Sequence, residues 1–474
     1  MSSEVQRLLD TITSAVTSLN QACATTGTTI PDIREPFHPS SENFRNSFEA
    51  LQAARIISAA ALQLEAIVAP PQIVLYHVVG GFLKSMALRV CLESNVTEIL
   101  REAGREGMHV KDIAKCNGQD PQKLARFLRY LCSNHVYMEV KPDVFANNRI
   151  SSLLDTKKSI AELRSRPLDK YKNTDGIAAL FGHNLDECFK GAAYAWEALN
   201  DPAMICAEEH LGTPLNKAFN TQVPYFKFIL NDDHRRVRFD ASMQGMEQLQ
   251  PADITLKAFE WESLPKGSKV VDVGGGIGNV LFPVAEHFPD LRLVIQDLPP
   301  VIESGKKIWT ERMPAAIETG QVTPEAHNFF DPQPHQDVSV FFVKHVLHNW
   351  SDASCVKILK RLRDASNPST RLVIMDSAMP YACRSKNQEK DGSTPGLAID
   401  EAPEPLLANY GSMNETAYVL DMVMFVILKA QERTYDQLNK LLNEAGWTVA
   451  SIKRKPGDAS FVQIEAKPVS SSEL

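Results

Sequence analysis

The sequence predicts an α/β fold in which a doubly wound sheet domain follows a helical region that contains a winged helix. Two observations predict the sheet. From Gly267 onward, short β-branched and apolar runs alternate with helical stretches, and a glycine-rich turn directly follows the first run. The winged helix is predicted by residues 75–154, where two helices joined by a short glycine-containing turn precede two extended segments.

The composition is that of a globular chain and excludes several classes of function. The 474 residues are 44% hydrophobic and 23% charged, and the net charge of −8 argues against a nucleic-acid footprint or a polybasic membrane patch. The eight cysteines contain no Cys-x-x-Cys pair, so we expect free thiols in a reducing compartment and no structural zinc. No signal-peptide pattern and no uncharged apolar run of about 18 residues is present. We therefore expect a cytoplasmic protein that neither spans a membrane nor binds nucleic acid.

We divide the chain into three parts. Residues 1–70 are expected to form an N-terminal helical extension and linker, whose last helix must stop at Pro70 because two successive prolines cannot continue it. Residues 71–250 are expected to form a helical, winged-helix region for dimerisation and for a lid over the substrate. Residues 251–474 are expected to form the sheet domain. Within it, residues 384–416 are rich in Gly, Pro and charge and lack apolar periodicity, so we expect a mobile surface insertion.

The winged helix has two interpretations, DNA binding and a scaffold for dimerisation. Its second helix, PQKLARFLRYLCSN, carries only three cations and the whole protein is acidic, which favours dimerisation. Because the helices near the N-terminus cannot bury their apolar faces alone, we expect an interlocked homodimer.

The strands of the sheet domain are predicted in SKVVDVGGG, LRLVIQDLP, VSVFFVKHV and STRLVIMDSA, with helices between them. Buried strands that alternate with helices indicate a parallel sheet covered on both faces. After the insertion we expect the helix AYVLDMVMFVILKA, a second helix around ERTYDQLNKLLNEAGW, and the terminal strands TVASIKRK and ASFVQIEAK.

The segment VVDVGGGIGN places Gly274, Gly276 and Gly278 directly after a strand. This spacing differs from the Gly-x-Gly-x-x-Gly of dinucleotide binders, and it lets a ligand without phosphates lie against bare backbone. Asp272 ends the strand and can orient the turn or accept a hydrogen bond from an ammonium group. Asp297 ends the next strand, where a carboxylate can accept both hydroxyls of a ribose. A purely structural strand–helix connection is the alternative, but the combination favours nucleoside binding.

Together, DVGGGIGN, QDLP, HNFFDP and FFVKHVLHNWSD resemble the class I S-adenosyl-L-methionine-dependent O-methyltransferases of the plant caffeic-acid type, with the fungal secondary-metabolite enzymes nearest to that type. The resemblance covers roughly residues 75–467 and leaves out residues 1–70 and the insertion. It implies a Rossmann-like methyltransferase domain, an N-terminal dimerisation domain and S-adenosyl-L-methionine as the cofactor. The cofactor-binding residues that it implies are Asp272, Gly274, Gly275, Gly276, Gly278, Asp297, Leu298, Asn328, Phe329 and Lys344.

Two of these positions have alternatives. Asn328 stands where the family usually has an aspartate that grips adenine, so this contact would lose its charge. Lys344 matches a basic residue that closes the site beside the cofactor, and a solvated lysine at a strand end is the other interpretation.

His345 and His348 lie three residues apart, but no third ligand follows at helical spacing, so we expect no metal site. The resemblance implies His348 as the general base, oriented by the acids Asp376 and Glu432. A neutral imidazole suits the removal of a proton from an alcohol or phenol oxygen at neutral pH. The family usually reads His-Asp-Trp, whereas this chain has Asn349 after His348, which removes a negative charge beside the base.

These residues imply an O-methyltransferase that acts on a hydroxyl of an aromatic or polyketide-type secondary metabolite. The alternative is a pericyclase or dehydratase of Diels–Alder or Alder-ene type, because some fungal relatives of this fold catalyse such reactions. In that case Lys344, paired with Asp240, would polarise a carbonyl group of the substrate. A binding or scaffold protein with a degenerate site is the third hypothesis. The intact base and its two acids favour methyl transfer, and Asn349 and the insertion favour the alternative.

The substrate is expected to contact the helical segment 210–250 and residues 417–426, which are rich in aromatic and methionine side chains. The same pattern also fits an ordinary hydrophobic core. The pocket candidates are Phe226, Phe228, Met243, Met246, Met422 and Phe425.

Overall fold

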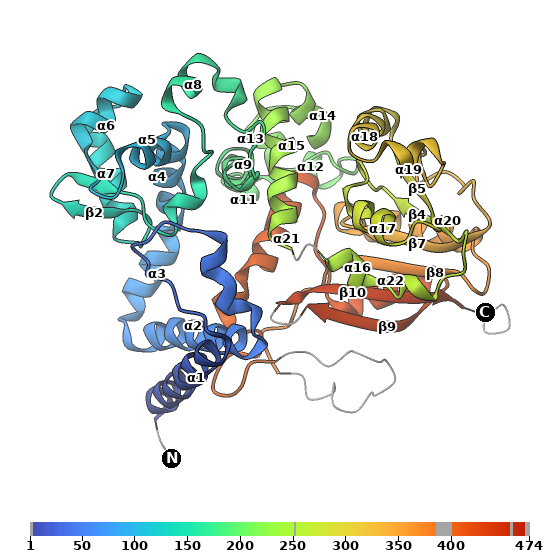
Figure 1. Ribbon diagram of the computed structural model, residues 1–474, viewed down its shortest axis with the longest axis horizontal. Coiled ribbons are helices and arrows are strands. Elements are labelled where there is room, and N and C mark those ends of the chain that lie inside the picture. The colour runs from blue at the N-terminus through green and yellow to red at the C-terminus, as the bar shows by residue number, and fades with distance from the viewer. Residues whose placement is uncertain (1–2, 251–252, 385–400, 456–457, 470–474) are drawn as a thin grey trace. The chain divides into compact units, whose positions relative to one another are not determined.

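The computed structural model describes residues 3–250, 253–384, 401–455 and 458–469. The chain divides into two compact units, Met1–Gln250 and Pro251–Leu474, which we call the helical unit and the sheet unit (Figure 1). Residues 385–400 of the predicted insertion lie outside the described residues.

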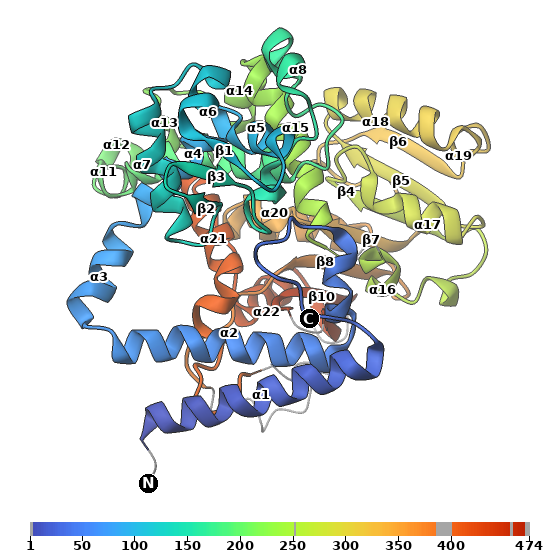
Figure 2. The same ribbon diagram turned by 60° about the vertical axis from the view of Figure 1, so that its left-hand side comes forward.

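The helical unit begins with two long helices, α1 (Glu4–Thr26) and α2 (Phe48–Val68), separated by the 3-10 helix η1 (Pro39–Asn46). Ser3 and Ser47 cap the two helix N-termini, and α2 ends before Pro70, as predicted. The two helices lie side by side (Figure 2) and contribute to a small core. The buried residues of this core are Leu19, Cys23, Phe44, Ala50 and Ala53.

Among the described residues, α2 is the one single helix long and apolar enough to cross a membrane, with a mean hydropathy of 1.3. The helices α3 (Pro71–Val79) and α4 (Gly81–Glu93), bent by 42°, meet the same criterion as a pair. The sequence of α2 is not an uncharged apolar run, because this helix contains Glu49, Arg55 and Glu65. Core helices meet this criterion of length and composition too.

The winged helix is confirmed, since two helices joined at Gly118 are followed by an antiparallel pair of strands. A third strand, β1, pairs with the other edge of β3 and was missed because two residues show no alternation. The elements are α5 (Val96–Ala103), β1 (Met108–His109), α6 (Val110–Asn117), α7 (Pro121–Cys132), β2 (Met138–Lys141) and β3 (Val144–Ala146).

The remainder of the helical unit contains only helices among its regular elements, as predicted. They are η2 (Ser151–Leu154), α8 (Ile160–Ser165), η3 (Pro167–Asp169), α9 (Ile177–His183), the π-helix η4 (Asn184–Cys188), α10 (Phe189–Ala192), α11 (Ala195–Leu199), α12 (Pro202–Ile205), α13 (Pro214–Ala218), α14 (Tyr225–Leu230) and α15 (Asp233–Gln248).

A buried ion network lies where η4 meets α15. One nitrogen of Arg238, Nη2, lies 2.6 Å from both Asp186 Oδ2 and Glu187 Oε1, and His183 Nδ1 lies 3.1 Å from Glu187 Oε2. Arg238 is buried. The sequence pattern did not reveal this network, because charged residues on a helix usually face solvent.

The sheet unit contains a seven-stranded sheet with the order β6-β5-β4-β7-β8-β10-β9. The first five strands in this order run parallel, as predicted. At the other edge, β10 pairs antiparallel with β8 and with β9, an orientation that the sequence pattern left open for the two terminal strands. Only two residues separate β9 from β10, too few for a parallel crossover. The strands are β4 (Lys269–Val273), β5 (Arg292–Asp297), β6 (Val322–Ala326), β7 (Val338–Lys344), β8 (Arg371–Ser377), β9 (Trp447–Lys455) and β10 (Asp458–Pro468).

The edge strand β6 was not predicted. Its sequence, VTPEA, is polar and contains a proline, which breaks the apolar pattern of a buried strand. Proline is tolerated there because an edge strand needs hydrogen-bond donors on one side only.

Helices cover both faces of the sheet, because successive side chains of a strand point to opposite faces. In β7, Phe341 and Val343 belong to one core, and Val340 and Phe342 belong to the other. The first core includes α20 (Asp352–Asp364) and α22 (Tyr435–Glu444). The second includes α16 (Ile254–Ala258), η5 (Trp261–Ser263), η6 (Asn279–Leu281), α17 (Phe282–His287), α18 (Pro299–Arg312) and α19 (Pro314–Glu318). The doubly wound architecture is thereby confirmed.

In the described part of the predicted insertion, several residues are packed rather than exposed. Ala402, Leu406 and Tyr410 are buried, and Arg384 donates to the carbonyl oxygens of Ala402 and Leu406 at 2.7 and 3.1 Å. An irregular segment without apolar periodicity can pack when side chains satisfy its backbone in this way. The segment leads into η8 (Gly411–Asn414) and α21 (Glu415–Leu428).

Candidate active site

The order of the strands reverses at β4, which lies between β5 and β7. In an open parallel sheet, the carboxyl ends of the strands beside such a point form the ligand-binding crevice. Asp272, Asp297, Lys344 and Asp376 lie at the carboxyl ends of β4, β5, β7 and β8. Residues far apart in the sequence thus share one edge of the sheet.

The glycine turn is tied to the end of β5 by backbone donors. The amide of Gly276 donates to Asp297 Oδ2 at 2.8 Å, and the amide of Leu298 donates to Asp297 Oδ1 at 2.7 Å. Each oxygen of Asp297 keeps a second lone pair for a ligand. Asp297 therefore orders the turn and is also placed to accept hydroxyl groups.

Two glycines in this turn leave room that a side chain would fill. A Cβ at Gly275 would lie 2.3 Å from Asp272 Oδ2, and one at Gly274 would lie 3.3 Å from Phe329 Cε1. Gly274 also has a φ of +67°, which disfavours any other residue. The turn therefore presents bare backbone between Asp272 and Phe329.

Asp272 is a buried carboxylate whose Oδ2 has no hydrogen-bond partner among the described residues. Burial raises the pKa of Asp272 to about 7, although the positive charge of Lys344 opposes this rise. A buried polar atom without a partner is costly, so a ligand that donates to it would be bound favourably.

Phe329 and Asn328 lie after β6. The ring of Phe329 packs edge-on against Trp350, with centroids 5.6 Å apart. Asn328 is exposed, and its Oδ1 accepts from the amide of Phe330 at 3.1 Å. The aromatic side chain is thus held against the glycine turn, whereas the side-chain oxygen of Asn328 is already used in a local turn.

The predicted base and its two acids come together in the sheet unit. His348 lies in the 3-10 helix η7 (Leu347–Asn349), and its Nδ1 lies 2.6 Å from Glu432 Oε1. The same nitrogen lies 3.8 Å from Asp376 Oδ1. All three side chains are buried, and Glu432 Oε2 has no partner among the described residues.

This surrounding charge alters the pKa values of the three groups. Burial alone would lower the pKa of His348, but the carboxylates of Glu432 and Asp376 outweigh burial and raise it to about 9. Burial raises the pKa of Glu432. Asp376 is buried as well, but the two nearby histidines lower its pKa. The site therefore holds an imidazole that is a stronger base than an ordinary histidine.

Asn349 supports the backbone beside the base. Its Nδ2 donates to the carbonyl oxygen of His345 at 3.1 Å, a bond that an aspartate could not make. His345 has a φ of +53°, a left-handed conformation that is uncommon for residues other than glycine. The departure from the family pattern thus has a structural role that the sequence did not reveal.

The sequence argument against a third metal ligand does not hold in the folded chain. Ligand atoms of His345, His348 and Asp376 all lie within 4.8 Å of one another, because β8 brings Asp376 beside the histidines. Asp376 lies on β8, far from the histidines in the sequence, so helical spacing along the chain could not reveal it. His348 Nδ1 lies 2.6 Å from Glu432 Oε1, so an ion could use that nitrogen only by breaking this bond.

The predicted substrate residues are not core residues. Phe226, Met243 and Met422 are 44%, 42% and 56% exposed, and Met246, Phe228 and Phe425 are half-buried. Those numbered 226–246 lie on α14 and α15 of the helical unit, whereas Met422 and Phe425 lie on α21 of the sheet unit. A common pocket for them stays a prediction.

Asp240, which was considered as a partner of Lys344, lies 3.9 Å from Arg236 on its own helix, α15. Its carboxylate is therefore used in an ordinary surface ion pair between residues one turn apart.

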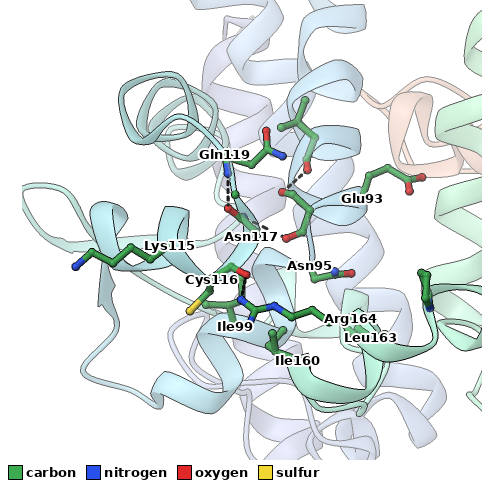
Figure 3. Close-up of a pocket in the computed structure, with 14 residues that line it drawn as sticks. Glu93, Asn95, Ile99, Lys115, Cys116, Asn117, Gln119, Ile160, Leu163 and Arg164 are labelled. Atoms are coloured by element: carbon green, nitrogen blue, oxygen red, sulfur yellow. Dashed lines mark hydrogen bonds between the residues drawn. The ribbon is translucent and has the colours of Figure 1, made fainter.

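A cavity of about 660 Å³ lies in the helical unit, among the ends of α4, α5, α6 and α8 (Figure 3). Its polar lining includes Glu93, Asn95 and Arg164, and Arg164 is already bonded to the carbonyl oxygen of Cys116. None of the predicted site residues lines this cavity.

Comparison with known proteins identifies the family. Residues 196–400 match the O-methyltransferase domain, and residues 76–157 match the O-methyltransferase dimerisation domain. A 4-O-methyltransferase 1 of Phanerochaete chrysosporium is 46% identical over 99% of this chain and 100% of its own length. The chain belongs to the O-methyltransferase family.

Solved structures show the same fold at low identity. LepI in complex with S-adenosylmethionine matches with a TM-score of 0.65 and 18% identity, over 97% of this chain and 99% of LepI. A structure described as a pericyclic reaction enzyme matches with a TM-score of 0.64 and 17% identity, over 97% of this chain and 100% of that one.

The cofactor of this O-methyltransferase is S-adenosylmethionine, and the residues at the switch point fit it. The buried, unpartnered Oδ2 of Asp272 can accept from the ammonium group of its methionine part, and the side-chain-free turn at Gly274–Gly276 leaves space beside that atom. Asp297 can accept the ribose hydroxyls, and Phe329 offers an aromatic surface.

Proposed function

We propose that this O-methyltransferase methylates a hydroxyl group on an aromatic or polyketide-type metabolite, with His348 as the general base. The observation that carries this proposal is the bond of 2.6 Å between His348 Nδ1 and Glu432 in a buried site at the sheet edge. The name of the Phanerochaete relative supports transfer to oxygen rather than a pericyclic step.

The chain's own residues divide the work of proton removal. With Nδ1 bonded to Glu432, His348 would take the substrate proton at Nε2, while the oxygen becomes nucleophilic. Glu432 and Asp376 stabilise the imidazolium that forms. A phenol has a pKa near 10, so a base with a pKa of about 9 accepts its proton at little cost. S-adenosylmethionine supplies the electrophilic methyl group.

One incubation tests this proposal. Purified protein with methyl-labelled S-adenosylmethionine and a panel of hydroxylated aromatic compounds should give S-adenosylhomocysteine and a product heavier by one methyl. His348→Ala should lower the rate by about 10²–10⁴-fold, whereas His287→Ala, which changes an exposed histidine on α17, should not. A product with the mass of the substrate, or that mass less water, with the cofactor recovered unchanged, would establish the pericyclase or dehydratase alternative instead.

We also propose that the protein is a homodimer and that α3 and the start of α4 form part of the contact with the second copy. No residue of α3 is buried, and five large apolar side chains in this stretch are 57–73% exposed: Leu75, Tyr76, Val78, Val79 and Phe82. The match to the dimerisation domain begins at residue 76, within α3. Large apolar groups exposed together are typical of interfaces.

Light scattering tests the dimer. The protein should run as a dimer at micromolar concentration, and the double variant Tyr76→Glu/Val78→Glu should be monomeric, since each charge would be buried in the interface. Leu249→Glu, at a position 50% exposed outside this stretch, should stay dimeric. A monomeric wild-type protein would contradict the proposal.

A further inference from the structure

Arg433 is a fully buried arginine in the sheet unit, only 1% exposed, that lies next to Glu432 in the chain. Its guanidinium donates through three nitrogens to three acceptors. Nη1 bonds the carbonyl oxygen of Leu347 at 2.8 Å, Nη2 bonds that of Trp350 at 2.6 Å, and Nε bonds Asp352 Oδ1 at 2.9 Å. Nη2 also lies 2.9 Å from Asp352 Oδ1, so the whole guanidinium is bound to the segment that follows β7.

These acceptors bracket the base. Leu347 precedes His348 directly, and Trp350 follows it by two residues, so the guanidinium spans the whole turn of η7. The carbonyl oxygen of Leu347 also accepts from the amide of Trp350 at 3.2 Å, the bond that closes the η7 turn. A planar guanidinium can bind this oxygen and that of Trp350 at once. The turn that carries the imidazole is therefore fixed from one side by a single rigid group.

The backbone of the segment that carries Glu432 and Arg433 is anchored independently. The carbonyl oxygen of Arg433 accepts from the amide of Met379 at 2.9 Å, just beyond the strand that holds Asp376. The amide of Glu432 donates to Asp421 Oδ1 on α21 at 2.8 Å. Two successive residues from one anchored segment thus reach the imidazole and the turn that carries it.

We propose that Arg433 is a positioning residue, which holds the η7 turn so that the imidazole of His348 meets the carboxylate of Glu432. Only the expected effect of Arg433 on the reaction rate rests on the proposed role of His348 as the general base. The geometry of the histidine–carboxylate pair does not depend on which reaction the protein catalyses.

The variant Arg433→Lys tests this role. A lysine ammonium cannot reach three acceptors that lie in the plane of a guanidinium, so the η7 turn should relax and the bond to Glu432 should lengthen. In an NMR titration of histidine-labelled protein, the pKa of His348 should fall from about 9 toward its ordinary value of about 6.5. We expect kcat to fall at least tenfold, with the KM for S-adenosylmethionine changed by less than about threefold.

The chain offers a matched control in Arg363, at the other end of α20. Its Nε donates to the carbonyl oxygen of Gly446 at 3.0 Å and its Nη2 to that of Val469 at 2.6 Å. Arg363→Lys should also lower the melting temperature, but the titration of His348 should not change. An equal change in both lysine variants would mean that Arg433 only stabilises the fold, and would overturn the proposal.

A second variant applies if Arg433→Lys does not fold. Asp352→Asn removes the charged acceptor of Arg433, and this side chain is 59% exposed, so the protein should fold. The pKa of His348 should then move in the same direction by a smaller amount, and an unchanged titration would overturn the proposal. If the titrations behave as expected but no methylated product forms, the proposed function fails while the positioning role stands.

Discussion

Replacing Glu432 with glutamine removes the charge that favours the imidazolium form of His348 while nearly keeping the side-chain shape. The rise in the pKa of His348 from about 6.5 to about 9 corresponds to roughly 3 kcal/mol of preference for the charged form. Glu432 makes the largest contribution to that rise, so Glu432→Gln should lower the pKa of His348 markedly, since burial then acts with less opposition.

The direction of the pH dependence follows from the protonation state in which a base acts. His348 accepts a proton only when neutral, so kcat/KM should rise with pH and level off above its pKa. With S-adenosylmethionine bound, the sulfonium charge would lower both midpoints, but the difference between wild type and variant should persist. At pH 9 the variant should be about 10²-fold slower, because its imidazole is a weaker and less well oriented base. Near pH 6.5 the two rates should converge, because little wild-type His348 is neutral there.

Stopped assays with labelled cofactor between pH 6 and 10 measure both curves, and NMR gives the pKa of His348 without catalysis. Glu444→Gln on α22 is the control, because this exposed carboxylate pairs only loosely with Lys440, at 3.8 Å. A midpoint for Glu432→Gln equal to that of the wild type would refute the assignment of His348 and Glu432 as a coupled pair.

Three further changes test the rest of the site. In calorimetry, the affinity of wild-type protein for S-adenosylmethionine should rise between pH 6 and 8, because Asp272 ionises near pH 7; Asp272→Asn should bind more weakly, with no such rise. Asp297→Ala should weaken binding by roughly 1.5–3 kcal/mol, the range for hydrogen bonds to a charged group, and an unchanged affinity would contradict the ribose assignment. Chelation with EDTA should leave the rate unchanged, because the proposed step uses His348 as a base and draws on no metal; a loss of activity that zinc restores would show a metal among His345, His348 and Asp376.

The order of elements could be predicted wherever a local pattern is strong. Four of the five parallel strands follow from apolar runs, and the winged helix follows from its helix–turn–helix spacing. The misses share a cause. β1 and β6 have too few residues or too polar a sequence, and their pairing is decided by neighbouring strands.

The residues of the site were predicted, but their pKa values and hydrogen-bond partners were not. The resemblance named His348 and Glu432, but not the raised pKa of the imidazole or the partnerless oxygen of Asp272. Arg433 was not recognised at all, because a single arginine in QERTYD gives no sign that it will be buried. Only burial and neighbouring charge determine these properties.

By itself, the sequence determined the sheet architecture and the glycine turn, since alternation, spacing and backbone freedom are local properties of the chain. It also placed Asp272, Asp297 and Asp376 at strand ends, which a parallel sheet must gather at one edge. The meeting of Glu432 and His348 across 84 residues of sequence was implied by the family resemblance alone, and the tertiary structure shows how it comes about. That pairing depends on how α21 and the segment after it fold back to the sheet edge, and long-range packing of this kind leaves no periodic signal in the chain.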